Sequence, residues 1–163
     1  MPLPHARQYS FGAGAHARFH AGWKAHGQAP QGMRARHHGF AEAAVARSAR
    51  LELYIPFEEA TFLAKSVDFA GGDWRARFFG AKARATLHVL PLERGETPKG
   101  EDPYERNNRW MLDAAARFGS EVDFVCLWNG EGGDGPGGTR DMMEEVQNRG
   151  GQALWLNTTK LWG

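Results

Sequence analysis

From Phe40 onwards, short apolar runs that are typical of β-strands alternate with segments of helical patterning. Strands that are separated by helices pair in parallel, because each helix returns the chain across the sheet in a right-handed crossover. The pattern therefore predicts an α/β fold, a three-layer Rossmann-like domain around a doubly wound and mostly parallel sheet. The predicted helices span residues 40–50, 57–67, 74–84, 102–118 and 139–148, and the predicted strands span residues 51–55, 86–90, 122–128 and 153–156.

Local signals set the boundaries of these elements. Residues 122–128 are almost continuously apolar, which predicts a strand that is buried on both faces. Asp102 is a suitable N-cap for the fourth helix, with Pro103 at its first position. Residues 93–100 carry a proline and two glycines and are predicted to form a polar loop.

Residues 1–38 differ from the remainder of the chain. They contain five basic and no acidic residues, so with a total charge of +1 the remainder carries +1 − 5 = −4. Leu3 is their only branched aliphatic residue, so they cannot bury enough apolar surface to offset the entropy of ordering. Six of the seven histidines lie here, but their spacing matches no common ligand pattern, and no metal site is predicted. We expect a disordered or aberrant segment at 1–38, then one domain at 39–163 whose sheet is incomplete on the N-terminal side.

The composition narrows the classes of partner. A formal net charge of +1 gives no reason to expect a nucleic acid or an anionic membrane. No apolar run approaches the ~20 residues of a membrane helix, and no secretory signal is visible. Cys126 is the only cysteine, which excludes an intrachain disulfide and suits a reducing compartment, so we expect a cytoplasmic protein. Because Cys126 lies within an apolar run, it is predicted to be inert packing.

A loop with six glycines, residues 128–139, joins the third strand to the last helix. In parallel sheets ligands bind beyond the carboxyl ends of the strands, where exposed amides at a helix N-terminus favour an anion. No lysine precedes Thr139, so the loop is not a P-loop, and Thr139 is predicted to be the N-cap or a hydroxyl donor to the anion. Glu131 and Asp134 would repel a phosphate unless they face a hydroxyl, a base edge or a metal. A glycine-rich surface turn is the alternative. The ligand contacts predicted in this loop are Asn129, Gly130, Gly133, Asp134, Gly135, Gly137, Gly138 and Thr139.

The fourth predicted helix adds three ligand candidates. Asn107 and Asn108 fall on its apolar face near its start, and a buried amide must be hydrogen-bonded. Both are predicted to touch ligand, with tethering of a neighbouring loop as the alternative. Arg109, like Arg106, is placed to meet a phosphate or to lie on a solvated helix surface. The only histidine of the folded part, His88, lies within a strand and suggests no catalytic pairing.

A resemblance to a known family is carried by residues 53–63, 66–67, 72–74, 107–110, 126–130 and 132–139. Over roughly residues 38–162, these stretches resemble a bacterial signalling module that is similar to the SMF/DprA–LOG-like (SLOG) superfamily of Rossmannoid nucleotide-binding domains. Pro136-Gly137-Gly138-Thr139 resembles a shortened form of the Pro-Gly-Gly-x-Gly-Thr loop of the LOG relatives. The resemblance implies recognition of a nucleotide, with Gly135, Gly137, Gly138 and Thr139 around its phosphate or ribose. The N-terminal side departs from the pattern, because residues 36–39 stand at the expected glycine turn and no opening strand is visible before them.

Three functions remain open. The first is a ligand-sensing module that binds a nucleotide or a nucleotide-derived signal through the loop at 128–139. It would need no cofactor, and its macromolecular partner would be a second copy or an effector domain. The second is a LOG-type nucleoside-monophosphate phosphoribohydrolase. The LOG pattern has a glutamate three residues after the loop threonine, where Met142 stands, so Asp141 and Glu144 are the catalytic candidates. The third is a non-binding remnant or interaction domain.

Overall fold

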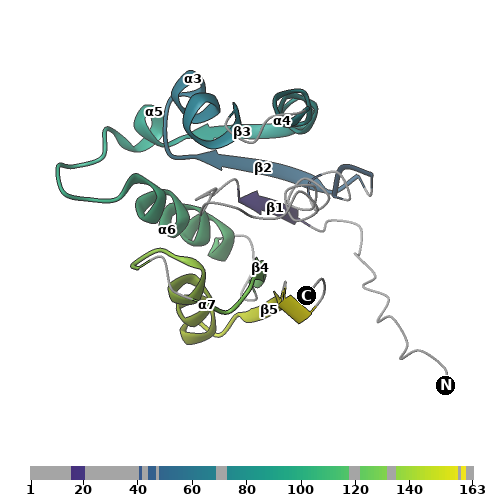
Figure 1. The fold of residues 1–163 in the computed structure, drawn as a ribbon, viewed down its shortest axis with the longest axis vertical. Coiled ribbons are helices and arrows are strands. Elements are labelled where there is room, and N and C mark those ends of the chain that lie inside the picture. The colour runs from purple at the N-terminus through teal and green to yellow at the C-terminus, as the bar shows by residue number, and fades with distance from the viewer. Residues whose placement is uncertain are drawn as a thin grey trace.

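The computed structural model describes residues 16–20, 41, 44–46, 48–68, 73–117, 122–131, 135–157 and 159–160, and of residues 16–20 and 127 only the backbone. Within these ranges the chain has a mixed α/β fold of short parallel strands and helices (Figure 1). The predicted fold class is confirmed at this level.

The strands form two parallel sheets. β1 (His16–His20), β2 (Arg50–Ile55) and β3 (Ala85–Val89) make the first, in the order β1-β2-β3. β4 (Asp123–Trp128) and β5 (Gln152–Asn157) make the second. In the described ranges the single doubly wound sheet expected from the sequence is therefore represented by two smaller sheets.

β1 lies in the segment that was expected to lack structure. Its register pairs His16 with Arg50 and His20 with Tyr54. The expectation that no opening strand precedes residue 36 is therefore wrong. A strand is held by backbone amides and carbonyls, which every residue except proline supplies, so it needs no branched aliphatic side chains once a partner strand is present. The other residues of 1–38 lie outside the described part of the chain.

Most helices lie where the sequence predicts them. Residues 41 and 44–46 are helical. α4 (Trp74–Lys82), α6 (Pro103–Ala116) and α7 (Thr139–Asn148) agree with the predicted segments to within a few residues. Asp102 caps α6 as expected, because its carboxylate accepts hydrogen bonds from the amides of Tyr104 at 2.8 Å and Glu105 at 3.1 Å.

Two connections differ from the prediction. The helix expected at 57–67 consists of α3 (Glu59–Phe62) and a π-helical turn, η1 (Leu63–Val67). The loop expected at 93–100 begins inside a short helix, α5 (Leu90–Arg94), which has Pro91 in its first turn. A first-turn amide has no partner within the helix, so a proline that ends a strand can also begin the next helix.

The main core lies between the first sheet and the helices that follow β2. Phe62, Val67, Trp74 and Phe78 pack with the inward residues of β2. Residues 51–55 are each no more than 3% exposed, so β2 is covered on both faces. A smaller cluster of Leu112, Met142 and Val146 joins α6 to α7 and continues to Val122 and Phe124.

β4 is not buried on both faces, contrary to the prediction. Val125 is 39% exposed, and its neighbour across the register, Leu154 of β5, is 43% exposed. The prediction assumed that β4 stands in the middle of a wide sheet. In the described residues β4 pairs with β5 alone, and the helical cluster covers the face that carries Phe124.

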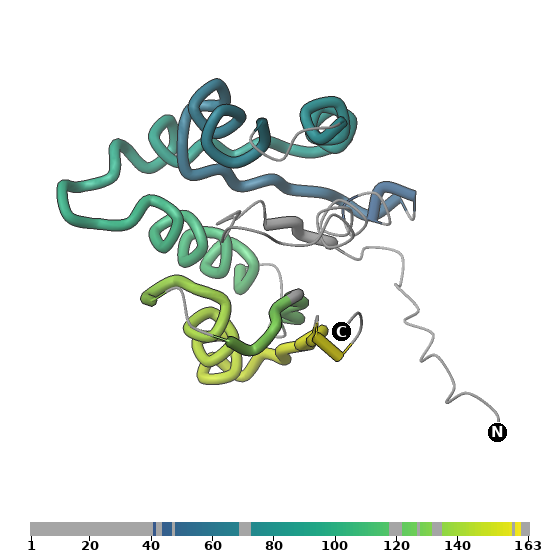
Figure 2. Tube along the Cα trace, in the orientation of Figure 1, coloured from purple at the N-terminus to yellow at the C-terminus, as the bar shows by residue number. Residues whose placement is uncertain are grey.

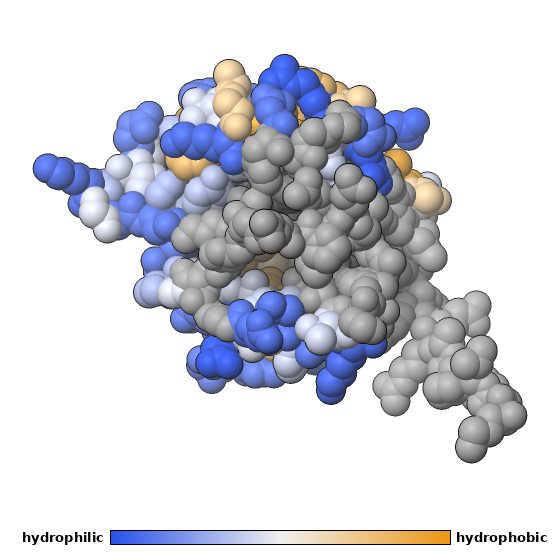
Figure 3. Space-filling model, in the orientation of Figure 1, coloured by the Kyte–Doolittle hydropathy of each residue, from blue (hydrophilic) through white to orange (hydrophobic). Residues whose placement is uncertain are grey.

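α6 connects the two halves of the molecule. It lies against β1 and β2 on one side and against α7 on the other (Figures 1 and 2). In the space-filling view, hydrophilic residues surround the end that carries α7, while apolar residues show mainly at the opposite end, near α3 and α4 (Figure 3). The surface around α7 is thus the more polar part of this face.

Candidate functional site

The glycine loop follows β4 and leads into α7, as predicted, and its residues 128–131 and 135–138 are described. Gly130, Gly135 and Gly137 have φ values of +86°, +75° and +76°, a region that favours glycine. Gly138, at φ −71° and ψ 176°, is the N-cap of α7, so the expectation that Thr139 is the N-cap is wrong. The other two candidates of this loop, Gly133 and Asp134, lie outside the described residues.

Gly137 fixes the loop to α6 and to the start of α7. Its carbonyl accepts a hydrogen bond from Nδ2 of Asn108 at 2.9 Å. Its amide donates to Oδ2 of Asp141 at 2.7 Å. A Cβ at this position would lie 2.5 Å from the Cα of Glu105, so only a glycine allows this approach. The loop is therefore packed against α6 at Gly137 and hydrogen-bonded to it, unlike a turn that lies free on the surface.

Asn107 and Asn108 are buried, with 0% and 9% of their surfaces exposed. Asn107 donates from Nδ2 to the carbonyl of Tyr54 at 3.3 Å, and Asn108 donates to Gly137. The expected tethering role is thus present for both residues. In each amide, however, Oδ1 is buried and has no hydrogen-bond partner in the described part of the chain. Tethering alone leaves half of each amide unsatisfied.

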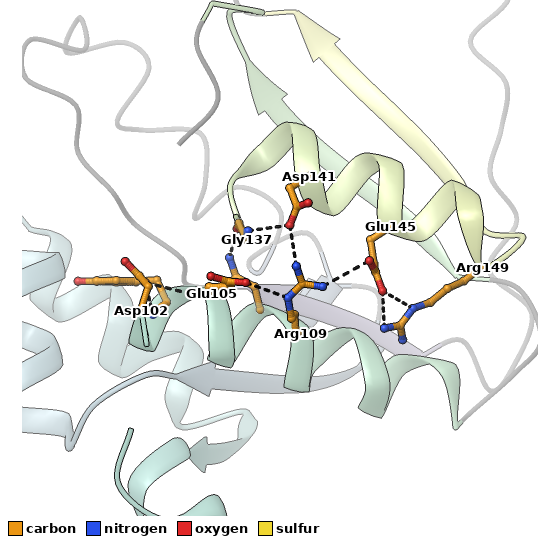
Figure 4. A network of polar contacts seen from close by, with 9 residues as sticks. Asp102, Glu105, Arg109, Gly137, Asp141, Glu145 and Arg149 are labelled. Carbon is orange, nitrogen blue, oxygen red and sulfur yellow. Dashed lines mark hydrogen bonds and ion pairs between the residues drawn. The ribbon is translucent and has the colours of Figure 1, made fainter. Parts of the chain in front are cut away.

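Arg109 is engaged by three carboxylates (Figure 4). Its guanidinium lies 3.1 Å from Glu105, 3.1 Å from Asp141 and 3.4 Å from Glu145. The hydrogen bond with Glu105 raises the pKa of Arg109, and the three negative charges add to this against the effect of desolvation. Glu145 also pairs with Arg149 at 2.6 Å, so the network extends along the α6–α7 contact. Arg109 thus links α6 to α7 and is already paired with three carboxylates.

Arg106 is used in a different way. Its guanidinium donates to the carbonyls of Arg94, Gly95 and Glu96 at 2.7–2.9 Å and holds the segment after α5 against α6. A cleft of about 310 Å³ lies between these segments, and Leu90, Arg94 and Trp110 are among the residues that line it. Four acidic and three basic side chains line the same cleft, namely Glu101, Asp102, Glu105 and Asp113 with Arg94, Arg106 and Arg109.

The start of α7 offers backbone amide donors. The backbone amides of Thr139 and Arg140 have no hydrogen-bond partner within the part of the chain that the structure describes. Such first-turn amides, with the helix dipole behind them, attract an anion. Arg140 is exposed, and its guanidinium lies 5.6 Å from the centre of the Trp128 ring.

The other end of the loop is supported by aromatic residues. The Trp155 indole donates to the Trp128 carbonyl at 2.9 Å, and the centres of the two rings are 5.4 Å apart. Gly130 is pressed against Trp155, because a Cβ at Gly130 would come within 2.9 Å of that ring. Asn129 is exposed, and its Oδ1 accepts from the amide of Glu131 at 3.0 Å.

The two catalytic candidates have contrasting surroundings. Asp141 is held by the Gly137 amide and by Arg109. Glu144 is exposed. Met142, at the position of the LOG glutamate, is 2% exposed and belongs to the cluster with Leu112 and Val146. The helix face that would carry a catalytic glutamate in the LOG pattern therefore points into the core.

A polar cluster that the sequence analysis missed lies on the first sheet. Glu52, 3% exposed, accepts from the Tyr54 hydroxyl at 3.0 Å and pairs with Arg50 at 3.1 Å. His88 lies 3.7 Å from Glu52 and 3.0 Å from Glu93, and its ring stacks on Tyr54. The alternation of residues 51–55 could have predicted this cluster, because it places Glu52 and Tyr54 on the face of the strand opposite the leucines. Parallel pairing then sets His88 beside Tyr54.

Cys126 has the environment expected of inert packing. It is a buried free thiol, and burial raises its pKa to about 11. A thiol becomes a nucleophile or a metal ligand as its thiolate, so this shift opposes both roles. In the described ranges, no three histidine, cysteine or acidic side chains come together to hold a metal ion.

Among the helices described, none combines the length and the apolar character that crossing a membrane requires. Comparison of the chain with protein-family models, with curated proteins and with solved structures finds no match.

Proposed function

We propose that the protein is a ligand-sensing module that binds a nucleotide or a nucleotide-derived signal at the glycine loop. The observation that carries the proposal is the junction between β4 and α7. There a close-packed glycine loop leads into a helix whose first amides, at Thr139 and Arg140, have no hydrogen-bond partner among the residues described. Backbone amides at a helix N-terminus match the geometry and charge of a phosphate, and the exposed Arg140 guanidinium adds a positive charge nearby.

Strand order supports the same position. The two sheets contain only parallel strands, in the orders β1-β2-β3 and β4-β5. In Figure 1, β1 lies between β2 and β4. If the sheets are halves of one Rossmann-like sheet, its order is β3-β2-β1-β4-β5, and the winding reverses between β1 and β4. In such folds ligands bind beyond the carboxyl ends of the strands at the point of reversal, where the glycine loop follows β4.

Asp141 is part of the proposed mechanism. In the described state its carboxylate lies on the Gly137 amide and on Arg109, two groups that would otherwise attract an anion. A phosphate at Thr139 and Arg140 adds negative charge beside this carboxylate and weakens its hold on the loop. The α6–α7 contact then changes when ligand binds, which is how a sensor would signal to a second copy or to an effector domain.

The enzyme alternative has less support. Met142 fills the core where the LOG pattern has a glutamate, and Asp141 is committed to Gly137 and Arg109. We therefore expect no release of free base from a nucleoside monophosphate. Release that is abolished by Glu144→Gln or Asp141→Asn would show instead that the protein is a phosphoribohydrolase.

The binding proposal is tested by thermal unfolding of the full chain with adenosine monophosphate, cyclic nucleotides and ADP-ribose. At least one of these should raise Tm, and the rise should shrink in Arg140→Ala. Arg84→Ala is the matched control, because it removes the same charge from an exposed site at the end of α4. If calorimetry with well-folded protein detects no binding of any nucleotide, the proposal is wrong.

A further inference from the structure

Two neighbouring asparagines of α6 share an unusual hydrogen-bonding state. Asn107 and Asn108 are buried, and each donates from Nδ2 to a backbone carbonyl. Among the residues that the structure describes, Oδ1 of each has no partner. Buried polar atoms are almost always hydrogen-bonded, because a buried acceptor without a partner has lost its hydrogen bonds to water and gained none in return. Two such acceptors on adjacent residues call for an explanation.

The orientation of both amides is fixed by chemistry. Tyr54 and Gly137 present carbonyl oxygens, which only accept hydrogen bonds. Turning either amide over would set one acceptor against another and lose the tether. The atom left over is therefore an acceptor in both residues, and only a donor group can satisfy it.

The position of these acceptors is also fixed. Asn107 reaches the carbonyl of Tyr54, next to the last residue of β2, while Asn108 reaches Gly137 in the glycine loop. The pair thus bridges the carboxyl end of the first sheet and the loop after β4. This is the edge at which ligands bind in parallel sheets.

We propose that Oδ1 of Asn107 and Oδ1 of Asn108 accept hydrogen bonds from an uncharged, donor-bearing part of the ligand, and that the phosphate lies elsewhere. This inference rests on the proposed function. Two parts of a nucleotide carry suitable donors: the ribose hydroxyls and the exocyclic amino group of the base. A phosphate is excluded from this position, because it offers the two oxygens only further acceptors. It belongs at the free amides of Thr139 and Arg140.

The first test is spectroscopic and needs no substitution. The chain has five asparagines, and the full protein labelled with ¹³C-asparagine gives one side-chain carbonyl signal for each. Saturation with the nucleotide that binds best should shift the Asn107 and Asn108 carbonyl signals in the direction of a new hydrogen bond. Asn148, exposed at the end of α7, is the internal control and should not move. Unchanged signals for Asn107 and Asn108 at saturation overturn the inference.

The second test separates the two sources of donors. Calorimetry compares adenosine with 2′,3′-dideoxyadenosine, which lacks the hydroxyls, and with purine riboside, which lacks the amino group; guanosine and its analogues are used if guanosine binds better. The analogue without the contacting donor should bind about 10-fold more weakly, as expected for one lost hydrogen bond. Equal affinity for all three nucleosides overturns the inference.

Variants complete the design. Asn108→Leu removes donor and acceptor, whereas Asn108→Asp keeps an acceptor and loses the tether to Gly137. Nucleoside affinity should fall about 10-fold in Asn108→Leu. If Asn108→Leu is unstable, Asn108→Asp must still distinguish adenosine from the weaker analogue. If nucleotides bind but none of these differences is seen, only the inference fails; if no nucleotide binds, both the inference and the proposed function fail.

Discussion

Gly137 lies directly on the backbone of Glu105, so closely that a Cβ on the glycine would be 2.5 Å from the Glu105 Cα. The two residues belong to the glycine loop and to α6, which the sequence separates by a strand. Because the contact is between backbones, no change of rotamer can relieve an added methyl group. The spacing between the loop and α6 is therefore set by the absence of a side chain at Gly137.

Replacement of Gly137 by alanine should lower the free energy of unfolding by about 2–3 kcal/mol, through overpacking and the strained positive φ. Gly135→Ala is a matched control. Gly135 has nearly the same φ, +75° against +76°, but its Cβ would meet nothing within 4 Å. We expect Gly135→Ala to lower the free energy of unfolding by only about 1 kcal/mol, because the strained φ is its sole cost; urea unfolding measures the difference. Equal losses in the two variants would show that the approach to Glu105 is not a tight one.

Asp141→Asn should leave the fold almost unchanged and increase the affinity of the loop for anions. The amide oxygen of asparagine can still accept from the Gly137 amide, and Arg109 retains Glu105 and Glu145 as partners. The partly exposed pair with Arg109 is worth less than about 1 kcal/mol. Titration with inorganic phosphate checks the second part, with Glu144→Gln as the control of equal charge. Weaker phosphate binding in Asp141→Asn would contradict the view that this carboxylate competes with the anion.

Tyr54→Phe should destabilise the protein by about 1–2 kcal/mol, because it removes a hydrogen bond to a carboxylate that is 3% exposed. Tyr104→Phe is the comparison, since the Tyr104 hydroxyl lies 3.0 Å from the neutral hydroxyl of Ser66. Loss of this neutral contact should cost about 0.5–1 kcal/mol. Urea unfolding of both variants measures the difference, and a smaller effect at Tyr54 than at Tyr104 would refute the ranking.

Cys126 should react slowly with iodoacetamide until the protein unfolds. Burial raises the pKa of the thiol to about 11, so at pH 8 only about 0.1% is thiolate, against about a quarter in an unfolded chain. Because the folded pKa is the higher one, this thiol contributes stability below the unfolded value, and that contribution is lost as pH rises towards 11. Mass spectrometry of alkylation in buffer and in urea gives the rates. Comparable rates at pH 8 would show that the strand does not shield Cys126.

Elements with local signals were predictable from the sequence. Asp102 and Pro103 predict the start of α6, and the structure confirms that Asp102 is the N-cap. The loop after β4 is readable because glycines follow an apolar run. Pro91 shows how the same residue supports two outcomes, since it ends a strand and begins a helix. β1 gives no local signal, because it is a strand by virtue of its backbone pairing with β2 and not of its own side chains.

Contacts between distant residues decided what could not be predicted. Arg109 was expected to meet a phosphate or to lie on a solvated helix surface. The sequence did not predict its pairs with Asp141 and Glu145, which are 32 and 36 residues away. For Asn107 and Asn108 the sequence left tethering and ligand contact as alternatives. The structure adds the tethers and leaves an unsatisfied oxygen on each residue. Which groups face each other across a helix pair is set by packing and not by spacing along either helix.

The carboxylate of Asp141 on the Gly137 amide also determines how affinity at this loop must be interpreted. The carboxylate is a fixed negative charge beside the amides of Thr139 and Arg140, so an anion that binds there, as proposed, must loosen the contact between Asp141 and the loop. The measured dissociation constant is then the intrinsic constant divided by the fraction of molecules in which the internal contact is broken, so the apparent affinity is lower. Weak binding would be the natural result even with good geometry, and the loop would respond to changes in ligand concentration without being saturated by traces of phosphate.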